Sequence, residues 1–212
     1  MRVQTAEFEL SAPGLNACPD DGVPEIAFIG RSNVGKSSLL NVLTNKKGLA
    51  RVSQTPGCTQ LINFFRINGT VRFVDLPGFG YAKVPKGHRA AFEDLIAGYL
   101  AGRANLCTVV VLVDSRLDPQ RIDLEFLTWL HGLGRDFAVA FTKIDKLKPA
   151  RAQRNANVFL EALGEARPPG DAVFLTSSES RAGKAELLGF LGKKAVSSTD
   201  KSGNLGGCYV QP

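Results

Sequence analysis

The stretch of this chain that could do chemistry most plainly is Gly30–Ser37, whose sequence GRSNVGKS has the spacing of a phosphate-binding loop. Gly30 and Gly35 let the backbone bend until successive N–H groups point into one concavity. Lys36 supplies a mobile positive charge for β- and γ-phosphates, and the Ser37 hydroxyl can ligate Mg²⁺. The alternative is a fortuitous glycine turn, which would match by accident in roughly one chain in a hundred. The loop therefore predicts binding of a nucleoside triphosphate.

A second motif, Asp75-Leu76-Pro77-Gly78, follows the run VRFV at residues 71–74. A carboxylate at the end of a strand can hold the coordination shell of Mg²⁺, and the N–H of Gly78 can meet a γ-phosphate. A strand that ends in a Pro-Gly turn explains the same residues equally well when they are taken alone. Together with the phosphate loop, the motif predicts a site for a Mg²⁺-bound nucleotide.

The third motif distinguishes between the purine bases. Residues 137–141 (FAVAF) predict a strand that delivers Thr142, Lys143 and Asp145 into a loop. The Asp145 carboxylate can accept hydrogen bonds from the N1–H and N2–H₂ groups of guanine. With adenine the buried carboxylate would stay unpaired, at a cost of about 1–3 kcal/mol. A solvated turn is the alternative, but the order of the motifs along the chain favours guanine.

A further predicted strand at residues 172–176 ends in Thr176 and is followed by Ser177 and Ser178. Small residues here suit a close approach of the backbone to the carbonyl oxygen of a purine. This signal has meaning only beside the three motifs before it.

Three stretches of the chain resemble one known family. They are Pro24–Asn41, the run TPGCTQ at 55–60 with INFF at 62–65, and DLPGFGYA at 75–82. In these motifs, and over about residues 7 to 192, the chain resembles the YihA/EngB ribosome-biogenesis GTPases. The resemblance implies GTP hydrolysis, Mg²⁺ as cofactor, and the large ribosomal subunit as partner.

The resemblance also implies that Thr59 is the switch residue that reaches Mg²⁺ and the γ-phosphate. The residues alone leave Thr55 equally plausible. Cys58 departs from the family, which usually has Arg or Lys at this place, so a charge contact made there by relatives is in question.

The candidate site residues fall into three groups. The predicted nucleotide-binding residues are Gly30, Arg31, Ser32, Asn33, Val34, Gly35, Lys36, Ser37, Ser38, Gly57, Thr59, Asp75, Gly78, Thr142, Lys143, Asp145, Thr176, Ser177 and Ser178. The predicted catalytic residues are Lys36, Thr59 and Gly78. The predicted Mg²⁺ ligands are Ser37, Thr59 and Asp75, the last acting directly or through a bound water.

Phe79 bears on the rate of hydrolysis. In GTPases of the Ras kind a glutamine at this place orients the attacking water, which phenylalanine cannot do, so we expect slow intrinsic hydrolysis. Related GTPases with a hydrophobic residue here often use K⁺ held partly by the phosphate-loop asparagine. Our hypothesis is that Asn33 ligates K⁺ and supplies charge stabilisation in the transition state. The alternative, that Asn33 only caps a loop turn, is equally open.

Strands are predicted near 26–29, 108–114, 137–142 and 172–176, and they alternate with helical patterns. Residues 63–67 and 71–75 are separated by too few residues for a parallel crossover, so they predict a hairpin built around Asn68-Gly69. We therefore expect an α/β fold: a three-layer, small-GTPase-like P-loop domain with a mostly parallel sheet and one antiparallel edge strand.

We expect one domain in the 212 residues, because 44% of them are hydrophobic and no linker or repeat divides them. The expected organisation is an N-terminal extension at 1–23, the GTPase domain at 24–194, and a flexible polar tail at 195–212. A helix from about 86 to 100 presents its apolar stripe to the core, and Trp129 is interpreted as packing on a helix face.

The net charge of +6 and the basic residues near both switches suggest contact with RNA phosphates. Lys46, Lys47 and Arg51 precede the first switch, and Lys83 and Lys86 are among those that follow the second. A solvated face that only aids solubility explains the charge as well. The resemblance, with the large ribosomal subunit as partner, favours the RNA interpretation.

The four cysteines lie far apart without a CxxC pair, which argues against a disulfide framework or a zinc site. The sequence shows neither a signal peptide nor an apolar stretch near the length that spans a bilayer. We expect a cytoplasmic monomer that binds GTP and GDP and no membrane.

Two other functions remain as alternatives. One is an RNA- or protein-binding adaptor whose guanine nucleotide is structural and rarely hydrolysed, which Phe79 favours. The other is a metabolic phosphotransferase, against which the guanine motif and the absence of an evident acceptor domain argue.

Overall fold

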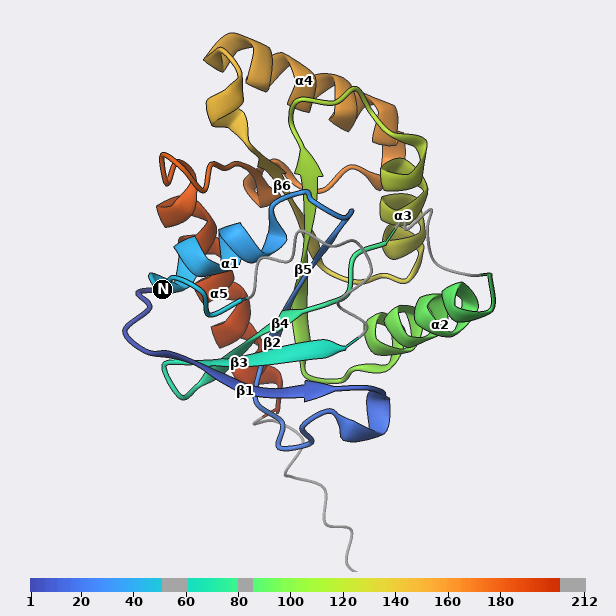
Figure 1. The fold of residues 1–212 in the computed structure, drawn as a ribbon, viewed down its shortest axis with the longest axis vertical. Helices are drawn as coiled ribbons and strands as arrows, with labels where there is room; N and C mark the ends of the chain where they lie inside the picture. Colours follow the sequence, from blue (N-terminus) through green and yellow to red (C-terminus); the bar gives the residue numbers. More distant parts are fainter. Residues whose placement is uncertain (51–60, 80–85, 203–212) are drawn as a thin grey trace, which may run out of the picture.

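The computed structural model describes residues 1–50, 61–79 and 86–202, and only the backbone within 86–93 and 198–202 (Figure 1). The strands are β1 (Ala6–Ala12), β2 (Glu25–Gly30), β3 (Ile62–Ile67), β4 (Val71–Asp75), β5 (Leu106–Asp114), β6 (Phe137–Thr142) and β7 (Val173–Leu175). The helices are α1 (Lys36–Thr44), α2 (Lys86–Gly102), α3 (Arg121–Gly132), α4 (Pro149–Leu163) and α5 (Lys184–Ser202). Short 3₁₀ turns are η1 (Leu15–Ala17), η2 (Ile144–Lys146), η3 (Gly164–Ala166) and η4 (Gly170–Ala172).

The strands form one seven-stranded sheet in the order β1-β3-β4-β2-β5-β6-β7. β2 pairs in parallel with β4 and β5, and the parallel pairing continues through β6 to β7. β3 runs antiparallel to β4, and Asn68 and Gly69 make their turn with φ of 51° and 71°. The predicted mostly parallel sheet with one antiparallel strand is confirmed.

The sheet continues beyond β3, where the sequence analysis placed its edge. β1 pairs antiparallel with β3, with Ala6 opposite Ile67 and Ala12 opposite Ile62. The edge strand is therefore β1, which comes from the segment expected as an N-terminal extension. A bulge between Phe8 and Leu10 interrupts the pairing, which is why the alternation of apolar residues in β1 is hard to recognise.

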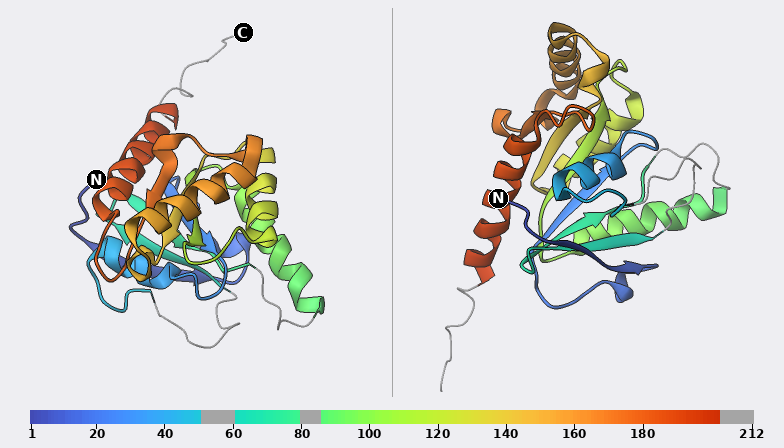
Figure 2. Two further views of the ribbon diagram at one scale, coloured as in Figure 1. Left: turned by 90° about the horizontal axis from the view of Figure 1, so that it is seen from above. Right: turned by 60° about the vertical axis from the view of Figure 1, so that its left-hand side comes forward.

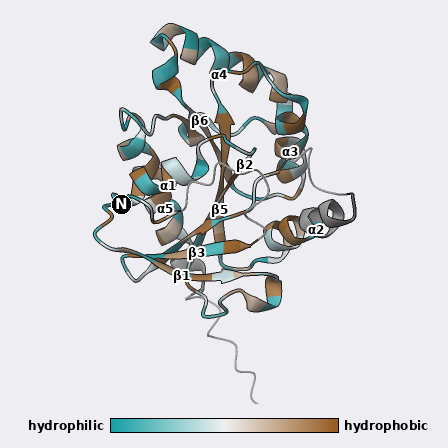
Figure 3. Cartoon of the chain, in the orientation of Figure 1, coloured by the Kyte–Doolittle hydropathy of each residue, from teal (hydrophilic) through white to brown (hydrophobic). Residues whose placement is uncertain are grey.

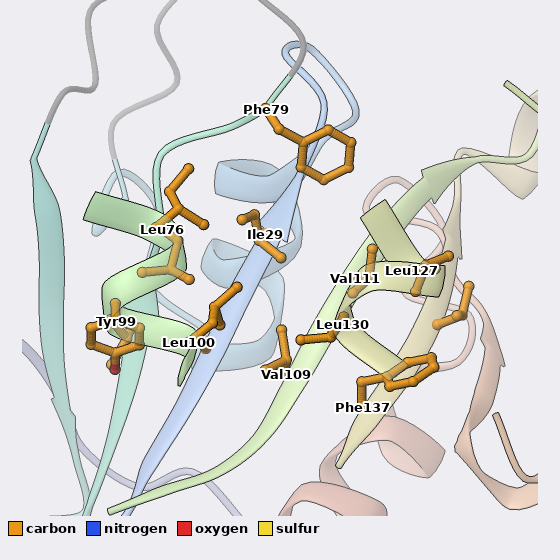
Figure 4. Packing of buried hydrophobic residues seen from close by; sticks show 14 of the residues in the cluster. Ile29, Leu76, Phe79, Tyr99, Leu100, Val109, Val111, Leu127, Leu130 and Phe137 are labelled. Atoms are coloured by element: carbon orange, nitrogen blue, oxygen red, sulfur yellow. The ribbon is translucent and has the colours of Figure 1, made fainter. Parts of the chain in front are cut away.

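Helices cover both faces of the sheet, which gives the three layers (Figure 2). Alternate residues of β2 belong to opposite clusters: Ala27 and Ile29 pack with α2, α3 and α4, and Ile26 and Phe28 pack with α1 and α5. Figure 4 shows the first cluster, where Leu100 of α2 and Leu127 of α3 lie over the strands. The strands are accordingly the most hydrophobic part of the chain, and the polar residues gather on the outer helices (Figure 3).

Charged groups tie the N-terminal segment to the end of the sheet that lies opposite the motifs. Arg72 of β4 is 1% exposed and donates to Glu9 through Nε at 2.9 Å and to Asp21 through Nη2 at 2.7 Å. Glu25 is fully buried and accepts from Nε of Arg103 at 2.8 Å. These contacts satisfy charges that would otherwise be costly to bury.

The C-terminal half differs from the sequence prediction at its last helix and at Trp129. α5 continues to Ser202, so the predicted polar tail from residue 195 is helical in its first part. Trp129 packs on Phe126 with ring centroids 5.6 Å apart, as predicted for a helix face, but is 38% exposed. Among the described residues, no helix is long and apolar enough to cross a membrane.

Candidate functional site

The predicted motifs meet at one edge of the sheet, where the parallel strands have their carboxyl ends. The phosphate loop follows β2, the Asp-x-x-Gly motif follows β4, and the guanine motifs follow β6 and β7. Ligands of open α/β sheets bind at this edge. The fold therefore assembles residues that lie more than a hundred positions apart in sequence.

The phosphate loop has the backbone geometry of an anion cradle. Gly35 has φ 103° and is the N-cap of α1, and no side chain caps the first turn. The N–H groups of that turn remain available for an anion, and the helix dipole favours negative charge there. Ser32 has a buried Oγ with no hydrogen-bond partner among the described residues. These features fit the phosphates of a nucleotide.

Close backbone packing joins the phosphate loop to the Asp-x-x-Gly motif. A Cβ on Gly78 would lie 2.8 Å from the carbonyl oxygen of Gly30, so only glycine fits without a shift of the backbone. The N–H of Phe79 donates to the same carbonyl oxygen at 3.2 Å, and Arg31 and Phe79 form an isolated β-bridge. The start of the second switch thus lies directly on the phosphate loop.

Lys36 and Asp75 are in direct contact. Nζ of Lys36 donates to Oδ1 of Asp75, and their side chains are 12% and 7% exposed. A carboxylate and the nearby Ser37 hydroxyl are the oxygen ligands that Mg²⁺ prefers, so this donor set fits the predicted metal. The lysine and the carboxylate are both placed at the phosphate end of the site.

At the base end of the site, Asp145 is held by a neighbouring loop. Oγ of Ser177 donates to Oδ1 of Asp145 at 2.6 Å, and Ser177 is 1% exposed. This hydrogen bond, together with the ammonium group of Lys146, lowers the pKa of Asp145. The group is therefore an ionised acceptor at neutral pH, as recognition of the N1–H and N2–H₂ groups of guanine requires.

Lys143 and Thr142 connect the base end to the phosphate end. Nζ of Lys143 donates to the backbone oxygen of Asn33 at 2.6 Å and to Oδ2 of Asp114 at 2.9 Å. Oγ1 of Thr142 donates to the backbone oxygen of Val34 at 2.7 Å. Direct contacts thus fix the guanine motif to the phosphate loop.

Some of the remaining predicted residues have a defined geometry, and others lie outside the described residues. Asn33 has φ 61°, a conformation that asparagine tolerates better than most residues. The N–H of Ser177 is bonded to the carbonyl of Ala182 at 3.2 Å, and that of Thr176 to Phe141 at 2.7 Å. Gly57 and Thr59, like Thr55 and Cys58, lie outside the described residues.

Two acidic residues of the site were missed by the sequence analysis. Asp114 ends β5 and pairs with Lys143; burial opposes its charge, but hydrogen bonds from Arg116 and Lys143 lower its pKa to about 2. Its place at the carboxyl end of a parallel strand could have identified it. Asp123, in the first turn of α3, faces Arg31 of the phosphate loop at 3.9 Å. Nothing local in the sequence singles it out.

Known proteins resemble this chain over most of its length. A family model described as "50S ribosome-binding GTPase" matches residues 25–143. The probable GTP-binding protein EngB of Porphyromonas gingivalis is 47% identical over 191 residues, which cover 90% of this chain and 95% of that protein. The probable GTP-binding protein EngB of Chlorobaculum tepidum is 47% identical over 188 residues, which cover 89% and 96%.

Solved structures agree as well. The crystal structure of a probable GTP-binding protein EngB matches with a TM-score of 0.69 and 27% identity, covering 82% of this chain and 99% of that chain. Era in complex with MgGDPNP and nucleotides 1506–1542 of 16S ribosomal RNA shares the fold, with a TM-score of 0.65, 21% identity, and coverage of 81% of this chain and 56% of that chain. From its motifs, its fold and these relatives, the chain belongs to the EngB family of GTP-binding proteins.

Proposed function

We propose that the protein is a slow GTPase that acts as a nucleotide-dependent switch in assembly of the large ribosomal subunit. The observation that carries the nucleotide half of the proposal is the Lys143 bridge, which joins the guanine-specific carboxylate loop to the phosphate loop. The family description as a ribosome-binding GTPase supports the ribosomal half. Hydrolysis would remove the γ-phosphate contacts and lower affinity for the partner.

Each part of the site has a distinct task in this proposal. Asp145, oriented by Ser177, accepts from the guanine base, and the uncapped N-terminus of α1 receives the phosphates. Lys36 neutralises β- and γ-phosphate charge. Ser37, Asp75 and Thr59 would hold Mg²⁺, which would supply positive charge against the phosphates.

The rate of hydrolysis depends on how water is oriented. Phe79 is 9% exposed, and its ring stacks on Phe126 with centroids 4.3 Å apart, so it offers no polar group to an attacking water. This arrangement supports the proposal of slow hydrolysis. The proposal includes Asn33 as a K⁺ ligand that adds transition-state charge; rates equal in K⁺ and Na⁺ buffers would remove that part of it.

The proposed partner surface is basic, so binding to RNA should depend on salt. Lys46 and Lys47 are exposed and follow α1 at the end away from the phosphate loop, where they can reach RNA phosphates. Neutralising several phosphates makes binding fall steeply as salt rises. We also propose that the working form is a cytoplasmic monomer, which sedimentation of the nucleotide-bound protein would test.

The central experiment is single-turnover GTP hydrolysis followed by pelleting with large ribosomal subunits. We expect phosphate release, tighter subunit binding with GTP than with GDP, and weaker binding in high salt. Lys46→Glu with Lys47→Glu should weaken subunit binding and leave GDP affinity unchanged. Subunit binding that ignores nucleotide and salt would contradict the switch. Absence of turnover with intact guanine binding would favour an adaptor with a structural nucleotide, which the buried Phe79 makes the second candidate.

A further inference from the structure

Asp123 is an acid in an unusual position. It lies in the first turn of α3, is 3% exposed, and its Oδ1 has no hydrogen-bond partner among the described residues. Burial raises its pKa to about 6, a change that the nearby positive charge of Arg31 only partly offsets. A buried carboxylate oxygen without a hydrogen bond destabilises a fold. Packing of the core alone does not account for this residue.

The charged groups around Asp123 show which residue its carboxylate attracts. Nη1 of Arg31, in the phosphate loop, lies 3.9 Å from its Oδ2, and Asp114 at the end of β5 adds a negative charge. The Arg31 side chain is 34% exposed, so the carboxylate is the more deeply buried member of the pair. The carboxylate therefore attracts the guanidinium group of Arg31 toward α3.

The backbone of Gly30 and Arg31 contacts the start of the second switch at Phe79. The β-bridge of Arg31 to Phe79, and the bond from the Phe79 N–H to Gly30, join the phosphate loop to the residue after the Asp-x-x-Gly motif. The Phe79 ring in turn stacks on Phe126, one turn beyond Asp123 on α3, with an interplanar angle of 17°. α3 thus contacts the loop through a charge and the switch through a ring.

We propose that Asp123 is a positioning residue of the nucleotide site: through Arg31 it holds the phosphate loop in its binding geometry and couples α3 to the second switch. This inference rests on the proposed guanine-nucleotide function. It makes α3 a structural support of the phosphate loop, and it explains why a destabilising buried charge is tolerated there.

The first test compares Asp123→Asn with Glu125→Gln. Glu125 lies on the same helix, its side chain is 62% exposed, and it pairs only with Arg121 of its own helix in the described residues. We expect GDP and GTP affinity to fall about fivefold or more in Asp123→Asn and to stay unchanged in Glu125→Gln. Arg31→Met should show a similar loss, and the double variant Arg31→Met/Asp123→Asn should lose no more than the weaker-binding single variant. Losses that multiply, or an unchanged affinity, would overturn the proposal.

A pH series separates positioning from a general loss of structure. The ratio of the GDP dissociation constants of Asp123→Asn and wild type cancels the titration of GDP itself. We expect this ratio to fall toward one as pH drops from 7.5 to 5, because the wild-type carboxyl becomes neutral as well. Asp123→Glu should restore part of the affinity at pH 7.5. A ratio independent of pH would refute the role of the charge.

A third readout needs no nucleotide. Hydrogen–deuterium exchange of the amides at 31–34 should be faster in Asp123→Asn than in wild type or Glu125→Gln at pH 7.5. Unchanged exchange would overturn the positioning role even if the chain bound no guanine nucleotide. A wild type that fails to bind GDP would refute the proposed function, and this exchange measurement would then decide the inference by itself.

Discussion

Replacement of Asp123 by asparagine should stabilise the nucleotide-free protein at neutral pH while weakening its site. The pKa of Asp123 is about 6 in the folded chain against an ordinary value of 3.8. At about 1.4 kcal/mol for each pKa step, the ionised carboxylate costs the fold about 3 kcal/mol at pH 7.5. Asparagine keeps the shape and removes the charge, but its buried amide hydrogens offset part of the gain. We expect a net gain of about 2 kcal/mol.

The pH dependence gives the sign of this effect. Between about pH 4 and 6 the folded state holds the Asp123 proton more tightly than the unfolded state, so this residue makes stability fall as pH rises through that window. Glu9, Asp21 and Asp114 act in the opposite direction, because their pKa values are lowered in the folded chain. The difference in the free energy of unfolding between Asp123→Asn and wild type isolates the contribution of Asp123. It should be near zero at pH 4 and complete at pH 7.5.

The assay is urea unfolding of nucleotide-free protein from pH 4 to 8, with Glu125→Gln as control. Bound nucleotide must be removed because it adds stability by mass action. A gain of about 2 kcal/mol corresponds to a rise of about 4–8 °C in melting temperature for a domain of this size. An Asp123→Asn variant that is less stable than wild type at pH 7.5 would show that the pair with Arg31 outweighs the burial, and the reasoning would be refuted.

Three further predictions concern other parts of the chain. Arg72→Met should lower the free energy of unfolding, measured in urea, by about 3 kcal/mol, because Glu9 and Glu25 lose a buried cation. It should also reduce the loss of stability that Glu9 contributes below about pH 4.5. An unchanged loss of stability in acid would contradict this prediction. Gly78→Ala should weaken GTP binding more than GDP binding. The new Cβ would lie 2.8 Å from the backbone oxygen of Gly30, so the backbone must shift and the Gly78 N–H would lose its predicted contact with the γ-phosphate, which GDP lacks. Equal losses measured by calorimetry would argue against a switch contact. Ser177→Ala should weaken GDP binding about tenfold in the same assay through loss of the 2.6 Å bond to Asp145, and an unchanged affinity would mean that Asp145 is held by other groups.

Contiguous motifs were predictable because one short segment carries both the structure and the chemistry. The loop at 30–37 contains its own bends, its lysine and its hydroxyl, and the strands on either side of it are strongly apolar. The hairpin of β3 and β4 was predictable for the same reason, since Asn68 and Gly69 adopt the positive φ values that a tight turn needs.

Features that depend on partners distant in sequence were not predictable. β1 joins the sheet through pairing with β3, some fifty residues later, and its bulge hides the alternation. Asp123 resembles any acid in the first turn of a helix, which the helix dipole favours, and only the fold brings it to Arg31. The role of Arg72 likewise emerges only when β1 and the loop after η1 bring Glu9 and Asp21 to it.

The proposed GTPase depends on recognition of guanine by Asp145, and a change of base specificity at this residue would demonstrate that recognition. Asparagine at this position can still accept a hydrogen bond from N1–H of guanine, but its amide N–H groups would face the 2-amino group, where two donors meet. Xanthine has a carbonyl oxygen in place of that amino group, and this oxygen can accept a hydrogen bond from the asparagine amide. The affinity of Asp145→Asn for GDP should therefore be lower by about a hundredfold or more, and its affinity for xanthosine diphosphate (XDP) should be higher, as measured by calorimetry with Mg²⁺ present. Asp171→Asn, an exposed acid in η4, is the matched control. A variant that binds GDP as tightly as wild type, without a gain for XDP, would contradict the account.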